Sequence, residues 1–216
     1  MIGPLGPGRP VGTTSRLDPA ALEVVVAAGR CADLAAMAVA AGRCVACPEL
    51  VRTRSSVVVG DTPPAARVVL IGEAPGAAED QQGRPFVGRS GQLLDELLAE
   101  AGLPRAEVAV LNVIKCRPPA NRPPRSAEVA RCGGWLDRQL QLLAPELIAT
   151  LGLSAMHRFL GKGRTLASTR GVLHQVGGRA LIATYHPSAA LRFGPRGAPL
   201  AALREDLGRV AAFVGR

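Results

Sequence analysis

Four short runs of apolar, mostly β-branched residues constrain the fold of this chain more than any other feature of the sequence. They span residues 67–72, 108–114, 147–152 and 180–186. Each run is apolar along nearly its whole length, as expected for strands that are covered on both faces. Helix-like segments separate the runs, and this alternation predicts an α/β fold. We expect a three-layer α/β/α sandwich around a central, mainly parallel, four-stranded sheet.

The segments between and around these runs show helical signals. Between the first two runs, leucines at positions 93, 94, 97 and 98 recur at helical spacing, Ser90 can cap the start and Gly102 can end the helix. This pattern predicts a helix over 90–101. Further helices are expected at 126–143, 154–160 and 198–214, and the Ala-rich segment 19–41 is expected to be helical with a break near Gly29.

Length and composition suit one large domain. The chain has 216 residues, of which 48% are hydrophobic, so it can bury a sizeable core. We expect a single domain over 18–216, preceded by a Gly- and Pro-rich disordered tail at 1–17. No stretch resembles a membrane span or a signal core. The sequence therefore predicts a cytoplasmic protein without a membrane partner, and a monomer is the simplest expectation.

The charge balance points to a polyanionic partner. Lys and Arg number 26 against 17 Asp and Glu, which gives a formal net charge of +9. Each phosphate neutralised by such residues releases a condensed counterion, so nucleic acid is the leading candidate. Only Lys115 and Lys162 are lysines, and an arginine-rich composition is also what a GC-rich genome produces.

Polar side chains stand at the ends of three predicted strands. Glu73 follows the first run, Asn112 lies near the end of the second, and His186 ends the fourth. Ligands of open parallel sheets bind at the carboxyl ends of the strands. We therefore expect a carboxylate, an amide and an imidazole to converge on one edge of the sheet.

The cysteines give a second signal. In a reducing compartment, five cysteines favour metal ligation or buried thiols over disulfides. Cys44 and Cys47 form a C-x2-C pair, and Cys132 lies sixteen residues beyond Cys116. Four thiolates suit either a [4Fe–4S] cluster or tetrahedral zinc, and the spacing leaves both open. Cys31 is expected to be a small buried residue.

Several ordered motifs resemble those of family 4 uracil-DNA glycosylases, and the resemblance spans about residues 44–192. The motifs are Gly72-Glu73-Ala74-Pro75-Gly76, Glu79-Asp80, Gly83 to Gly88, Ser90 to Leu94, Asn112 to Pro119, Asn121-Arg122, and His186-Pro187-Ser188 up to Arg192. This resemblance implies excision of uracil from single- or double-stranded DNA, which leaves an abasic site for base excision repair. It also implies a [4Fe–4S] cluster on Cys44, Cys47, Cys116 and Cys132.

The same resemblance implies roles in base recognition and catalysis. Glu73 and His186 are the expected catalytic residues, with Phe86 stacking on an extruded uracil and Asn112 reading its edge. The resemblance leaves open whether Glu73 orients a water or stabilises the oxocarbenium ion. Ala74 stands where other glycosylases of the superfamily place an aspartate. Asp80 is a second candidate, with helix capping as its alternative role. The full expected substrate-binding set is Gly72, Ala74, Pro75, Gly76, Asp80, Phe86, Asn112 and His186.

Two segments are expected to contact DNA. One is the basic loop with Lys115, Arg117, Asn121 and Arg122, whose alternative is a merely solvated loop. The other follows the last strand and contributes Ser188, Leu191 and Arg192. Ala189 and Ala190 are small, so Leu191 and Arg192 are the expected wedge and phosphate contact. His157, in a helix, and His174, in a turn, are expected to be structural.

Two alternatives remain at this stage. A related branch forms a stable covalent bond to DNA through a histidine in a basic insert, but residues 117–131 contain no histidine, so ordinary turnover is expected. The other alternative is a non-catalytic DNA-binding module. A module that only binds DNA has no reason to keep Glu73, Phe86, Asn112 and His186 together.

Overall fold

A computed structural model describes residues 18–64 and 66–215; the expected tail at 1–17 lies outside them. The strands are β1 (Val68–Gly72), β2 (Val108–Asn112), β3 (Leu147–Leu151), β4 (Leu173–Val176) and β5 (Arg179–Thr184). The helices are α1 (Pro19–Gly29), α2 (Leu34–Gly42), α3 (Pro48–Thr53), α4 (Ala77–Gln82), α5 (Arg89–Glu100), α6 (Ser126–Leu143), α7 (Leu153–Leu160), α8 (Leu166–Thr169), α9 (Pro187–Phe193) and α10 (Ala198–Val214). None of these helices is both long and apolar enough to cross a bilayer.

The strands form one sheet in the order β2-β1-β3-β5-β4. β1 pairs in parallel with β2 and β3, and β3 pairs in parallel with β5. β4 pairs antiparallel with β5 at the edge, so the expectation of four strands was wrong and the sheet has five. β4 is four residues long and half exposed, so it lacks the apolar run that marks a buried strand. His174 lies on this strand and not in the expected turn.

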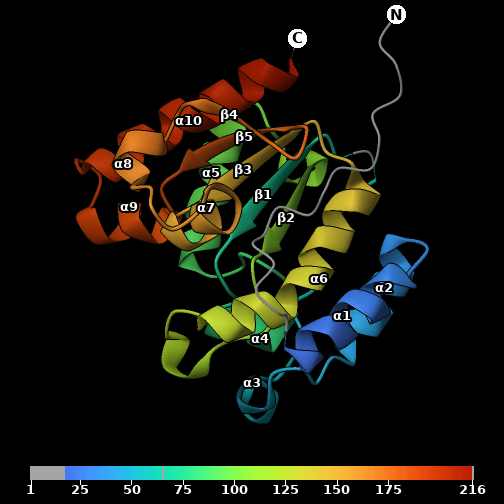
Figure 1. Ribbon diagram of the computed structural model, residues 1–216. Coiled ribbons are helices and arrows are strands. Elements are labelled where there is room, and N and C mark those ends of the chain that lie inside the picture. Colours follow the sequence, from blue (N-terminus) through green and yellow to red (C-terminus); the bar gives the residue numbers. More distant parts are fainter. Residues whose placement is uncertain (1–17, 65, 216) are drawn as a thin grey trace, which may run out of the picture.

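Helices cover both faces of the sheet, which confirms the three-layer sandwich. Along β1, Val69 and Ile71 join a core with residues of α1, α2, α6 and α7. Val68 and Leu70 point to the opposite face and pack with residues of α5, α9 and α10. Figure 1 shows the sheet between α6 with α1 and α2 on one side, and α5 with α10 on the other. Because successive side chains of a strand point to opposite faces of the sheet, the same strands contribute to two separate cores.

The N-terminal helices pack closely against α6. α1 ends at Gly29, and Asp33 caps the start of α2 by accepting a hydrogen bond from the Ala36 N–H, so the expected break is confirmed. A Cβ added at Gly134, in the middle of α6, would lie 3.0 Å from backbone atoms of Val25 on α1. Gly134 therefore serves the close approach of two helices, which offsets its poor helix propensity.

Candidate functional site

The ends of β1 and β2 lie side by side, and we call the group of Gly72, Asn112 and Phe86 that meets there the pocket floor. Gly72 and Asn112 are register partners at the carboxyl ends of these strands. A Cβ built on Gly72 would lie 2.5 Å from Asn112 Oδ1 and 2.6 Å from Phe86 Cζ. The amide and the phenyl ring thus face each other across a space that only a glycine leaves open. Asn112 is 2% exposed, and its Oδ1 finds no hydrogen-bond partner in the described part of the chain.

His186 lies directly beside this floor. Its ring centroid is 5.5 Å from that of Phe86, with an angle of 31° between the planes. Nδ1 accepts a hydrogen bond from the backbone N–H of Ser188 at 3.1 Å and lies 2.8 Å from Ser188 Oγ. Burial lowers the pKa of the imidazole from 6.5 to about 4, although the Glu79 carboxylate opposes this shift. The ring is therefore neutral near pH 7, with its proton on Nε2.

Glu73 follows Gly72 and is held by a residue that the sequence did not single out. Ser154 Oγ donates a hydrogen bond to Glu73 Oε2. Ser154 lies on the first turn of α7, just after the end of β3. Gly152 brings the same segment against His186, since a Cβ added there would lie 3.0 Å from His186 Cβ. The ends of β1, β2, β3 and β5 thus all contribute to one site.

The turn after β1 places the other expected substrate contacts. Ala74, Pro75 and Gly76 connect β1 to α4, and the Gly76 N–H donates to Glu79 Oε2 at 3.1 Å. Asp80 is 1% exposed, and its carboxylate accepts hydrogen bonds from the backbone N–H groups of Ser55 and Ser56. This buried carboxylate holds a neighbouring loop, so the geometry favours a structural role for Asp80.

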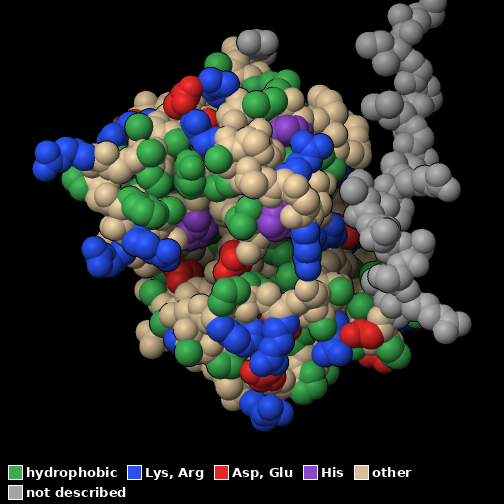
Figure 2. Space-filling model, turned by 60° about the vertical axis from the view of Figure 1, so that its left-hand side comes forward, with side chains coloured by type: hydrophobic (Ala, Val, Ile, Leu, Met, Phe, Trp, Pro, Cys, Tyr) green, Lys and Arg blue, Asp and Glu red, His purple; other side chains and the backbone are tan. Residues whose placement is uncertain are grey.

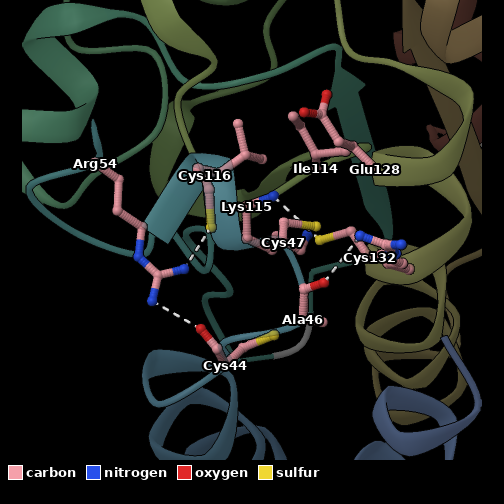
Figure 3. A pocket seen from close by; sticks show the side chains of 11 residues that line it. Cys44, Ala46, Cys47, Arg54, Ile114, Lys115, Cys116, Glu128 and Cys132 are labelled. Carbon is pink, nitrogen blue, oxygen red and sulfur yellow. Dashed lines mark hydrogen bonds between the residues drawn. The ribbon is translucent and has the colours of Figure 1, made fainter. Parts of the chain in front are cut away.

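The four expected cluster ligands line one cavity. Cys44 and Cys47 lie between α2 and α3, Cys116 follows β2, and Cys132 belongs to α6. Figure 3 shows their sulfur atoms turned toward a shared space. Cys31 lies elsewhere, buried, with its thiol donating to the Ala27 carbonyl at 3.4 Å. Segments far apart in sequence therefore bring four thiols together.

Arg54 contacts two of the cysteines of this cavity. Arg54 donates through Nη1 to Cys116 Sγ at 2.9 Å and through Nη2 to the Cys44 carbonyl at 2.7 Å. Burial, reinforced by neighbouring thiols, raises the pKa of Cys47 to about 11; burial also raises that of Cys132 to about 12. The free thiols therefore hold their protons at neutral pH, and any metal that binds them must displace those protons.

The basic loop departs from expectation at two positions. Lys115 is 1% exposed, and its Nζ donates to the Asn112 carbonyl at 3.0 Å, so the expected phosphate contact of Lys115 is wrong. Burial lowers the pKa of this amine to about 8. Arg122 forms a salt bridge with Glu128 at 2.6 Å and a longer one with Glu49. Arg117 donates to Asn121 Oδ1, and Asn121 is exposed.

The residues after the last strand that are expected to contact DNA lie on α9. Leu191 is 40% exposed and Arg192 is also exposed, whereas Ser188 turns its hydroxyl toward His186. Phe193, which the sequence analysis did not consider, is 65% exposed on the same helix. Figure 2 shows Lys and Arg side chains around a hollow in which histidine and acidic side chains are visible. This face has the positive surroundings that a phosphate backbone requires.

Comparisons with known proteins identify the family of this chain. Residues 59–208 match the family model of the uracil DNA glycosylase superfamily. A type-4 uracil-DNA glycosylase of Thermotoga maritima is 46% identical over 152 residues, covering 69% of this chain and 79% of that protein. A type-4 enzyme of Pyrobaculum aerophilum is 42% identical, covering 69% and 80%. A type-5 uracil-DNA glycosylase of Thermus thermophilus is 33% identical, covering 67% and 82%. The chain therefore belongs to the uracil DNA glycosylase superfamily and, within it, to the type-4 enzymes.

Proposed function

We propose that this protein hydrolyses the N-glycosidic bond of uracil in DNA, releasing free uracil and leaving an abasic site. One observation carries the proposal: the buried amide oxygen Asn112 Oδ1, which has no partner among the described residues, lies near the Phe86 ring beside a neutral imidazole. A buried acceptor without a partner costs about 1–3 kcal/mol. A ligand that donates a hydrogen bond to it recovers that cost.

The pocket floor suits an extruded pyrimidine. A base must leave the stack before an enzyme can reach its glycosidic bond. The Phe86 ring offers a flat stacking surface, and Asn112 offers an acceptor to the N3–H of uracil and a donor to its O4. Cytosine presents the opposite pattern at these two positions. Asn112 thus supplies the preference for uracil.

His186 supplies the hydrogen bond that strengthens during bond breakage. Its Nδ1 is occupied by the Ser188 N–H, so Nε2–H is the free donor of the neutral ring. As the glycosidic bond stretches, negative charge develops on the uracil oxygens. A preorganised donor in a site without water stabilises that charge, and removal of such a donor typically lowers the rate by about 100- to 1000-fold.

Glu73 supplies the negative charge of the site. The sugar becomes positively charged as uracil departs, and a nearby carboxylate stabilises that charge or orients the attacking water. Ser154 holds Oε2 of this carboxylate, which leaves Oε1 for the reaction. We assign Ser154 the role of orienting Glu73.

The cysteine cavity fits a [4Fe–4S] cluster by the chemistry of its donors. Cys44, Cys47, Cys116 and Cys132 would hold it, and the Arg54 hydrogen bond to Cys116 suits a thiolate ligand. Four thiols suit a [4Fe–4S] cluster or tetrahedral zinc, and the resemblance to the type-4 enzymes favours the cluster. A bound cluster would cross-link the segment before α3, the end of β2 and α6.

Side chains at the surface of the basic loop and of α9 would hold the DNA. Arg117 and Asn121 in the basic loop, and Arg192 on α9, are the candidates for phosphate contacts, since Lys115 is buried and Arg122 is engaged by carboxylates. Leu191 is the candidate for the side chain that fills the gap left by the extruded base. Phosphate contacts predict binding that weakens steeply with salt.

The decisive experiment measures release of uracil from oligonucleotides. The purified protein is incubated with strands that carry one uracil, opposite guanine, opposite adenine, or unpaired, and with matched cytosine and thymine strands. We expect free uracil and alkali-labile abasic sites from the uracil strands alone. Asn112→Ala and His186→Ala should each lower the rate by about 100-fold or more. Full activity of both variants would remove the pocket assignment.

A further inference from the structure

Glu79 joins two segments of the pocket through its carboxylate. Oε1 accepts hydrogen bonds from the backbone N–H groups of Val87 at 3.0 Å and Gly88 at 2.9 Å. Oε2 accepts from the Gly76 N–H at 3.1 Å. Gly76 ends the turn that begins after β1, whereas Val87 and Gly88 directly follow Phe86. One charged side chain therefore fixes the turn that carries Glu73 and the loop that carries Phe86.

The Phe86 loop needs such a clamp because its backbone is strained. Phe86 has a φ of +53°, in the left-handed region that aromatic residues rarely adopt. Strain of this kind costs about 1–3 kcal/mol and persists only where the surroundings enforce it. Gly91 packs against the other side of the loop, since a Cβ there would lie 1.7 Å from the Phe86 carbonyl oxygen. Glu79 and Gly91 thus hold the strained residue between α4 and α5.

We propose that Glu79 is the positioning residue that holds Phe86 in its stacking orientation. This inference rests on the proposed uracil excision, but it concerns a carboxylate that does not act on the sugar or on water. Both oxygens of Glu79 accept hydrogen bonds from backbone N–H groups, so the carboxylate cannot approach the sugar without releasing the loop. Two of its three hydrogen bonds hold the residues that follow Phe86, so its effect on the reaction passes mainly through Phe86.

The effect should fall on base binding and on the excision rate together. Without the carboxylate, the loop relaxes from the strained conformation and the ring leaves the space above Gly72. A displacement of about 1 Å in a positioning element can lower a rate by about 100-fold. Contacts of the DNA backbone lie on other elements, so affinity for undamaged DNA should stay within about twofold of the wild-type value.

The test compares Glu79→Ala, Glu79→Gln and Phe86→Ala with the control Glu96→Ala, whose carboxylate is exposed on α5. Three quantities are measured on the full-length protein: the single-turnover rate of uracil release, the inhibition constant of free uracil, and the affinity for undamaged DNA. We expect Glu79→Ala to lower the rate and weaken inhibition by about 10- to 100-fold. Glu79→Gln, which keeps one acceptor oxygen, should be intermediate.

The double variant Glu79→Ala/Phe86→Ala separates this role from a general loss of folding. If Glu79 acts through Phe86, adding Glu79→Ala to Phe86→Ala should lower the rate by less than about twofold further. Additive effects, or loss of activity with an unchanged inhibition constant, would overturn the inference. Hydrogen exchange at residues 86–88 gives a readout without DNA: faster exchange in Glu79→Ala is expected, and unchanged exchange also overturns it. A wild-type protein that releases no uracil would instead refute the proposed function.

Discussion

Replacing Gly72 by alanine tests whether the pocket floor is the space that the base enters. The added Cβ would lie 2.6 Å from Phe86 Cζ and 2.5 Å from Asn112 Oδ1, whereas ordinary contact begins near 3.4 Å. The ring must therefore withdraw by about 0.8 Å, and the methyl group fills part of the space of the base. Such overpacking costs about 1–3 kcal/mol of stability. A misplacement of this size at a reacting site lowers a rate by about 100-fold.

The assay is the single-turnover rate of uracil release, measured beside the thermal unfolding midpoint. Gly72→Ala should lose about 100-fold in rate while its midpoint falls by only several degrees. Gly208→Ala is the matched control, because a Cβ at this exposed position of α10 meets nothing within 4 Å and alanine favours a helix. A Gly72→Ala protein that works at the wild-type rate would refute the placement of the base between Phe86 and Asn112.

Three further predictions concern other parts of the molecule. The folded protein keeps His186 neutral down to about pH 4, whereas the unfolded chain binds its proton near 6.5, so acidification between these values should lower stability by up to about 3 kcal/mol. Denaturant titrations at several pH values give the free energy of unfolding of the wild type and of His186→Asn. The wild type should lose more of this free energy than the variant as the pH falls, and an equal pH dependence in both proteins would contradict the prediction. Cys132→Ser should lose iron, visible absorption and thermal stability together; a colourless, stable and fully active variant would be the opposite result. With uracil-containing DNA the wild type should turn over repeatedly, and an adduct that survives denaturing electrophoresis would show that the expectation of ordinary turnover is wrong.

The sequence predicted the features whose physical cause lies in the local pattern of residues. Apolar β-branched runs predicted the four parallel strands to within a few residues, since strands buried on both faces leave a continuous apolar pattern. The polar residues at the strand ends were expected at one edge, and the structure places Asn112 and His186 around Phe86 there. Because parallel strands end at the same edge of the sheet, residues more than a hundred positions apart in the sequence meet there.

The sequence did not predict the features that depend on packing between distant segments. β4 escaped notice because an exposed edge strand has no apolar signature. Lys115 looked like a surface cation, but the chain turns its amine inward to the Asn112 carbonyl. The contacts of Ser154 with Glu73, and of Glu79 with the Phe86 loop, depend on how α7 and α4 sit against β1. No pattern along the chain encodes such placements.

The most direct measurement is the structure of the protein with free uracil bound at saturating concentration. The base should stack on the Phe86 ring, donate its N3–H to Asn112 Oδ1 and accept a hydrogen bond from His186 Nε2. A uracil that binds away from Phe86, or that leaves Asn112 Oδ1 without a partner, would contradict the convergence of these side chains on one extruded base.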